Sequence, residues 1–201
     1  MRFQRDTKEV NEAAQALNLS TADPFKVGFH PWLNIRSARW LRFGSAPTNT
    51  MHKVAEAVQR STALPFLHIV DPTAEAIKSA GLKRVALIGT RFTMQDSFFR
   101  TRLMELHGIE ALVPEANDQA LVHRIIFEEL CKGLVHDASR EASAGVVARL
   151  EDAGAEGLIL GCTELTLLIG QGDLALPVFD TTELHLRHAL AFALDSAQPA
   201  R

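Results

Sequence analysis

From Thr48 onward, short apolar runs alternate with longer stretches in which apolar residues recur every three or four positions. The short runs predict buried strands, and the longer stretches predict amphipathic helices. Strands separated by helical patterns of ten or more residues indicate βαβ units and a parallel sheet. We therefore predict an α/β fold whose strands cover residues 64–70, 84–88, 109–113, 157–160 and 176–179.

The helical patterns also predict which side chains are buried. The segment 48–61 should be a helix with Val54, Ala57 and Val58 on its buried stripe. A helix over 118–132 would place Cys131 beside the apolar residues of its core face, so Cys131 is expected to pack. The remaining predicted helices cover residues 71–80, 93–107, 139–153 and 182–194.

Residues 1–46 carry no sustained hydrophobic period of two or 3.6 positions. Glu9–Leu19 is compatible with one short amphipathic helix, and the segment contains no glycine-rich phosphate loop. It predicts no strand that could be buried in a sheet.

Composition narrows the class of protein. The 201 residues are 47% hydrophobic and carry a formal net charge of −3, which suits a globular chain and gives no sign of a nucleic-acid or membrane-surface partner. No apolar run approaches the roughly 18 residues that cross a bilayer, and the N-terminus is too polar for a secretory signal. With only two cysteines, Cys131 and Cys162, a cytoplasmic location is expected.

The segment Gly157 to Leu168, GLILGCTELTLL, holds the first candidate for chemistry. Cys162 follows a predicted buried strand, at the edge where open α/β sheets bind ligands. Thr163 and Glu164 should begin the next helix, whose positive end would lower the pKa of the thiol. The competing interpretation is that Cys162 is a buried structural cysteine, and the spacing alone does not separate the two.

Hydroxyl groups recur where other predicted strands end. Thr48-Asn49-Thr50 opens one helix, Gly89-Thr90 follows a strand and Asp180-Thr181-Thr182 follows another. Gathered at one sheet edge, such groups suit a small ligand that carries a carboxylate. Each threonine taken singly is equally typical of a helix N-cap.

Histidines offer weaker signals. His185 and His188 are three positions apart on the last predicted helix, but no neighbouring ligand set indicates a metal. His52 lies four positions after Thr48 and could contact it across one helical turn.

Five segments together resemble the aspartate/glutamate racemase family. They are TNTMHK at 48–53, GTRFTM at 89–94, IIFEELCKG at 125–133, GLILGCTEL at 157–165 and PVFDTTELH at 177–185. The resemblance is nearest to the L-aspartate/L-glutamate-specific amino-acid racemases, in which threonine replaces the first catalytic cysteine.

That resemblance implies a cofactor-independent enzyme in which two related lobes each supply one proton carrier to the substrate Cα. It implies Cys162 and Thr48 as the carriers, Asn49, Thr50 and Thr163 as substrate-binding residues, and Thr90 and His185 as secondary ones. It also implies a small amino-acid substrate, no cofactor and a homodimer.

The lobes expected from the resemblance are unequal. Residues 1–70 would form the N-terminal lobe, completed by 185–201, and residues 71–184 the C-terminal α/β lobe. Family members begin with a strand and a GlyGlyMetSer-like loop, which residues 1–46 lack. We therefore expect an incomplete or divergent first lobe.

Two alternatives remain open. Another activity of the superfamily, such as that of a hydantoin racemase or a maleate isomerase, would also use paired strand-end residues. A protein that only binds a small dicarboxylate would follow from a first lobe too divergent for catalysis.

Overall fold

The computed structural model describes residues 48–195, which fall within one compact unit. The helix expected at Glu9–Leu19 and the other predictions for residues 1–47 lie outside the described residues. No helix of the described part is both long and apolar enough to cross a membrane.

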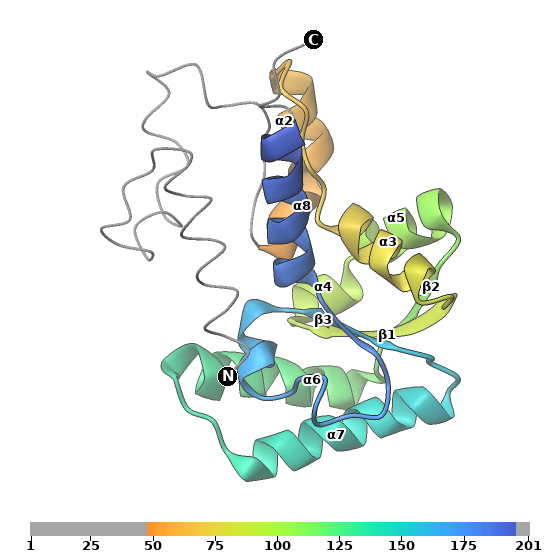
Figure 1. The fold of residues 1–201 in the computed structure, drawn as a ribbon. Helices are drawn as coiled ribbons and strands as arrows, with labels where there is room; N and C mark the ends of the chain where they lie inside the picture. Colours follow the sequence, from red (N-terminus) through yellow and green to blue (C-terminus); the bar gives the residue numbers. More distant parts are fainter. Residues whose placement is uncertain (1–47, 196–201) are drawn as a thin grey trace. The chain divides into compact units, whose positions relative to one another are not determined.

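The centre of the described unit is a four-stranded sheet in which every neighbouring pair is parallel (Figure 1). The strand order is β2-β1-β3-β4. The prediction of an α/β fold with a parallel sheet is confirmed, with small shifts at the strand ends. The bounds are β1 Arg84–Gly89, β2 Glu110–Leu112, β3 Leu158–Gly161 and β4 Val178–Asp180.

The segment 64–70, predicted to be a strand, is not part of the four-stranded sheet. Only Phe66 takes part in a β-bridge, and helix α3 (Val70–Ser79) begins at the last of these residues. The side chain of Gln59 bonds the local backbone, accepting from the Phe66 N–H at 2.8 Å and donating to the Leu64 carbonyl at 2.9 Å.

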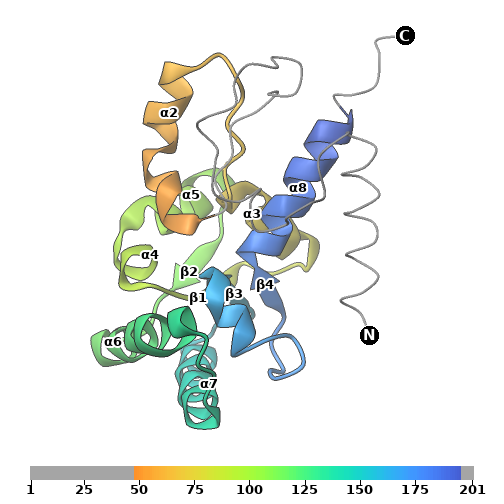
Figure 2. The same cartoon turned by 90° about the vertical axis from the view of Figure 1, so that its left-hand side faces the viewer.

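Side chains of the strands alternate between the two faces of the sheet, as the pleat requires. Val85, Leu87 and Ile159 pack with helix α3 and helix α5 (Ser97–His107). Ala86 and Leu158 face the other way. Helices therefore cover both faces, which is why the strands are apolar throughout (Figures 1 and 2).

The second face is covered by α6 (Ala116–Arg124), the π-helical turn η2 (Ile125–Glu129) and α7 (Asp137–Asp152). The chain was predicted to run as one α-helix through residue 132. Instead it passes through η2 and then a 3-10 turn, η3 (Leu130–Lys132). A π turn adds one residue, which rotates the following side chains by about 100° around the helix.

The first described element is also not the expected α-helix. Asn49–Val54 forms a 3-10 helix, η1, followed by the short α-helix α2 (Ala55–Ser61). Because a 3-10 helix repeats every three residues, Asn49, His52 and Ala55 share the buried face. Val54 is 47% exposed, so the predicted buried stripe is wrong.

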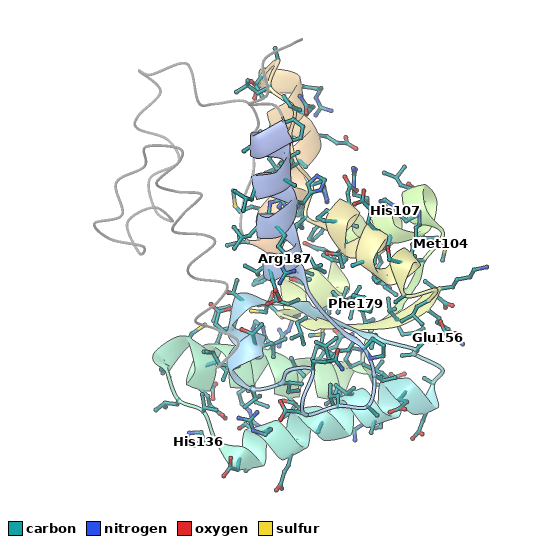
Figure 3. All side chains as sticks on the ribbon, viewed as in Figure 1. Met104, His107, His136, Glu156, Phe179 and Arg187 are labelled. Atoms are coloured by element: carbon teal, nitrogen blue, oxygen red, sulfur yellow. The ribbon has the colours of Figure 1, made fainter. Side chains whose placement is uncertain are left out.

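Gly89 is followed by helix α4 (Arg91–Gln95), and the extended residue Asp96 separates α4 from α5. The last helix, α8 (Thr181–Asp195), starts directly after β4 and lies beside α3. At the opposite end of the sheet the carboxylate of Glu156, labelled in Figure 3, accepts hydrogen bonds from the backbone N–H groups of Lys83 and Arg84. This fixes the start of β1.

The outer edge of β4 is bonded by a side chain. Gln171 accepts from the Val178 N–H at 2.8 Å and donates to the Leu176 carbonyl at 3.2 Å. One amide group thus takes the backbone positions that another strand would use.

Candidate active site at the ends of strands β1 and β3

A cavity of about 230 Å³ opens at the carboxyl ends of β1 and β3. The chain leaves β1 for β2 on one side and returns as β3 on the other, so this is the point where the strand order reverses. Open α/β sheets bind ligands at such a point. The lining residues are Thr48, Asn49, Thr50, Thr90, Thr93, Ile126, Phe127, Cys131, Gly161, Cys162, Thr163 and Glu164.

Six of the seven predicted site residues line this cavity; His185 does not. Those six come from three separate parts of the sequence. One part is the start of η1, and the other two directly follow β1 and β3. The sequence did not single out Thr93, Glu164, Ile126, Phe127 or Cys131 as site residues. Of these, Glu164 had a usable signal, since it lies two positions after Cys162.

Two glycines let the strand ends approach each other. Gly89 and Gly161 are paired in register, and a Cβ on Gly89 would lie 3.0 Å from the Gly161 carbonyl oxygen. A Cβ on Gly161 would meet Thr93 Cγ2 at 3.0 Å. Side chains at these positions would push apart the strands that form the cavity floor.

Cys162 follows β3 directly, as predicted, but no α-helix begins there. The five residues Thr163–Leu167 form a 3-10 turn, η4. The Cys162 thiol donates a hydrogen bond to Glu164 Oε2 at 2.9 Å, and the Thr163 hydroxyl donates to the same oxygen at 2.7 Å. The thiol therefore faces a carboxylate rather than the positive end of a long helix.

This contact reverses the expected acidity of the thiol. Burial and, next, the hydrogen bond to Glu164 raise the pKa of Cys162 well above its usual range. The expectation of a lowered pKa is therefore wrong. Burial works against ionisation of Glu164 too, but the hydrogen bonds from Cys162 and Thr163 outweigh it and lower the pKa of Glu164. The resting pair is a thiol beside a carboxylate.

Asn49 is held in one orientation. Thr181 Oγ1 donates to the Leu160 carbonyl at 2.8 Å, so it can only accept from Asn49, whose Nδ2 lies 2.9 Å away. Asn49 Oδ1 is buried and has no hydrogen-bond partner within the described residues. Asn49 is also one of the residues that line the cavity.

Thr90 is the N-cap of α4, where its hydroxyl accepts from the Thr93 N–H. Both interpretations of Thr90 thus hold together, since it caps a helix and lines the cavity. The hydroxyls of Thr90 and Thr93 are 3.3 Å apart.

His185 lies on a different face of this region, among buried rings. The ring of His52 packs edge-on against His185 and His68, with centroids 5.3 and 4.7 Å apart. His52 Nδ1 accepts from the Ile69 N–H, so the expected contact of His52 with Thr48 gives way to this packing. Burial, followed by repulsion from His52, lowers the pKa of His68 to about 3 and that of His185 to about 4.

Cys131 reaches the cavity because of the π turn. The predicted α-helix would have packed Cys131 in the core, but the rotated η3 leaves it exposed and lining the cavity. Ile126 and Phe127, on the π turn itself, form an apolar wall. The sequence pattern could not reveal this rotation, because it assumes an uninterrupted period.

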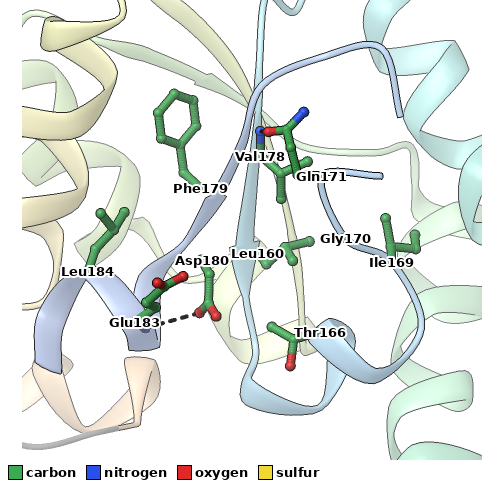
Figure 4. Close-up of a pocket in the computed structure, with 10 residues that line it drawn as sticks. All are labelled: Leu160, Thr166, Ile169, Gly170, Gln171, Val178, Phe179, Asp180, Glu183 and Leu184. Atoms are coloured by element: carbon green, nitrogen blue, oxygen red, sulfur yellow. Dashed lines mark hydrogen bonds between the residues drawn. The ribbon is translucent and has the colours of Figure 1, made fainter. Parts of the chain in front are cut away.

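Other cavities contain none of the predicted site residues. One of about 230 Å³ lies between β4 and the loop after η4 and includes Asp180 and Glu183 (Figure 4). Another, of about 370 Å³, is lined by Phe66, His68 and Arg102, among others. No cluster of metal-ligating side chains exists within residues 48–195.

A parallel α/β sheet with hydroxyl, amide, thiol and carboxylate groups at its switch point is typical of α/β domains that bind small polar molecules. The chain belongs to the Asp/Glu/hydantoin racemase family, because residues 45–189 match the model of that family.

Solved structures agree with this assignment. The chain is 47% identical to a candidate Asp/Glu racemase from Yersinia pestis, with a TM-score of 0.73 over 76% of this chain and 66% of that one. It is 38% identical to an aspartate racemase homologue from Pyrococcus horikoshii, with a TM-score of 0.70 over 76% of this chain and 67% of that one.

Among curated proteins, the broad specificity amino-acid racemase RacX of Bacillus subtilis is 24% identical over 147 residues. The match covers 70% of this chain and 60% of RacX. A glutamate racemase from Roseiflexus is 30% identical, and the match covers 49% of its length. The chain thus spans only part of these racemases.

Proposed function

We propose that the protein is a cofactor-independent racemase of acidic amino acids, aspartate or glutamate, which moves protons at the substrate Cα. One observation carries the proposal: Thr48 and Cys162, which are 114 positions apart in the sequence, line one cavity with Asn49, Thr50 and Thr163. These are the residues that the family resemblance implies for proton transfer and substrate binding.

In this mechanism Cys162 removes the α-proton from one face and Thr48 donates a proton to the other. A thiolate is needed, and the resting residue is a thiol bonded to Glu164. Glu164 is the group positioned to take the thiol proton, after which the carboxylic acid no longer repels the thiolate. The unpartnered Asn49 Oδ1 suits the substrate ammonium group.

The two proton carriers are chemically unequal. A threonine hydroxyl is a far weaker acid than a thiol and needs a neighbouring base to remove a proton. His52, which could have contacted Thr48 across one helical turn, packs against His68 and His185. Thr48 is therefore better suited to donate a proton than to take one, and kcat should differ between the two enantiomers.

The proposal is tested by exchange of the α-hydrogen of L-aspartate and L-glutamate in D₂O. The parent chain should exchange it, and Cys162→Ser should reduce the rate by about 100-fold or more. Thr48→Val, which removes the hydroxyl but keeps the shape, is compared with Thr48→Ser, which keeps the hydroxyl but loses the methyl group. Absence of exchange in the parent chain, with correct folding by circular dichroism, rules the racemase out.

A second candidate, a protein that only binds a small dicarboxylate, is favoured by the raised pKa of the Cys162 thiol. A protonated thiol cannot accept the α-proton. The two candidates separate in one experiment: a binder shows thermal stabilisation by aspartate or glutamate without exchange, whereas a racemase shows both. Hydantoin and maleate, offered as alternative substrates, test the related activities of the superfamily.

A further inference from the structure

The cavity contains a second sulfur atom that the proposed racemisation does not use. Cys131, on η3, and Cys162, directly before η4, both line it. The elements η3 and η4 pack against each other. Both cysteines are free thiols, and Cys131 is the exposed one.

A carboxylate accompanies the two sulfurs. Glu164 accepts the hydrogen bond of the Cys162 thiol, and it lines the same cavity as Cys131. Burial and, next, the charge of Glu164 raise the pKa of Cys131. Cys131 is in turn among the groups that raise the pKa of Cys162. The three side chains are therefore close enough to interact electrostatically.

We infer that Cys131 and Cys162 form a reversible disulfide when the protein meets a peroxide, and that this bond closes the cavity. The exposed Cys131 is the sulfur that a peroxide reaches first, and the more buried Cys162 is the one that resolves the product. That the bond stops racemisation rests on the proposed function; that it forms does not.

The chemistry balances without another reactant. The Cys131 sulfur attacks one peroxide oxygen and the O–O bond breaks. The leaving hydroxide takes up the thiol proton and departs as water, and the sulfur is oxidised to a sulfenic acid. The Cys162 sulfur then attacks the Cys131 sulfur, the S–O bond breaks and the S–S bond forms. The Cys162 proton passes through Glu164 to the leaving hydroxide, which departs as a second water.

Local backbone geometry supports the pairing. The π turn places Cys131 at the cavity, and Gly133, with φ of 74°, ends η3 two residues later. A disulfide needs Cα atoms within about 7 Å of each other, and η3, which carries Cys131, packs against η4, which directly follows Cys162. The sequence alone predicted a packed Cys131 and no disulfide.

The test treats the full chain with hydrogen peroxide and measures intact mass and peptide maps without reductant. The expected product is an intramolecular Cys131–Cys162 disulfide, seen as the loss of two hydrogen atoms and reversed by dithiothreitol. Cys131→Ser and Cys162→Ser should each abolish this product. Only sulfinic acids, or only disulfide-linked dimers, would overturn the inference.

Exchange of the α-hydrogen supplies the second readout. Peroxide should reduce exchange by the parent chain about tenfold or more, with recovery in dithiothreitol. For Cys131→Ser, measured against its own untreated rate, the loss should be slower and should not recover. If the parent chain shows no exchange at all, the proposed function fails, and the mass measurement still decides whether the disulfide forms.

Discussion

Asn49 and Thr181 form a buried hydrogen bond of 2.9 Å between residues 132 positions apart. It joins η1, which directly follows Thr48, to the start of α8, and Thr181 in turn donates to the Leu160 carbonyl on β3. This chain of two bonds ties the first proton-carrier segment to the strand that leads to Cys162. The relative position of the two proposed carriers depends on it.

Thr181→Val should therefore destabilise the protein by about 2–3 kcal/mol, because it leaves the Asn49 amide without this partner in a buried place and removes one bond to the Leu160 carbonyl. Thr181→Ser, which keeps the hydroxyl, should cost much less. Urea unfolding followed by circular dichroism measures both. Equal losses for valine and serine would show that the hydroxyl is not the important group.

Glu164→Gln should make the Cys162 thiol easier to ionise and yet slow exchange of the α-hydrogen. Removing the carboxylate charge should lower the pKa of the thiol, since that charge and its hydrogen bond contribute to the present rise. Alkylation of Cys162, measured against pH in a Cys131→Ser background, should then occur at lower pH. Exchange of the α-hydrogen should fall by about 100-fold, because the proton acceptor is gone. An exchange rate that stays unchanged or rises while the pKa of the thiol falls would contradict the role given to Glu164.

The buried histidines predict how stability depends on pH. Their folded pKa values, about 3 for His68 and about 4 for His185, lie below the ordinary value of 6.5. The folded state therefore binds fewer protons than the unfolded state once the pH falls below about 6.5, and the stability present above that pH is lost on acidification. By pH 5 the loss should be about 2 kcal/mol for each histidine.

His68→Asn removes one titrating ring and can keep the acceptor that bonds the Val70 N–H. It should flatten the decline of the unfolding free energy between about pH 6.5 and pH 4, measured by urea titration at each pH. Arg102 and Asp71 also act on His68, with opposite signs, and both stay in place. An unchanged slope would mean that His68 is not a source of the acid sensitivity.

Gly161→Ala should destabilise the fold by about 1–3 kcal/mol, because the new methyl group meets Thr93 and the Ile88 carbonyl at the cavity floor. Gly172→Ala is the matched control, since a Cβ there has nothing within 4 Å. Thermal unfolding of both variants tests the contrast. Similar melting temperatures would show that the strand ends can relax around a side chain.

The hydrophobic pattern of the sequence predicts most of the sheet correctly. The strands around Val85 and Ile159 are predicted correctly because burial on both faces leaves a continuous apolar run. The run at Leu64 looks the same but lies outside the four-stranded sheet, and Gln59 bonds part of its backbone. Nothing in the hydrophobic pattern encodes such a side-chain contact.

The site divides in the same way. The position of Cys162 just after a strand follows from the pattern, and so does its proximity to Thr90, since parallel strands end at one edge. Its protonation state does not follow, because it depends on the side chain of Glu164 and on burial. Likewise, the exposure of Cys131 depends on a π turn that the residue types in this segment do not predict.

The amide of Gln171 on the outer edge of β4 also affects how copies of the chain can meet. An incoming strand would have to displace a side chain that already satisfies the Val178 N–H and the Leu176 carbonyl. Edge-to-edge growth of the sheet, the first step of many aggregates, is therefore disfavoured on this side. The expected homodimer would have to pair elsewhere than along β4. Gln171→Ala, by baring these two groups, should make the protein more prone to aggregate on mild heating while leaving the cavity at β1 and β3 intact.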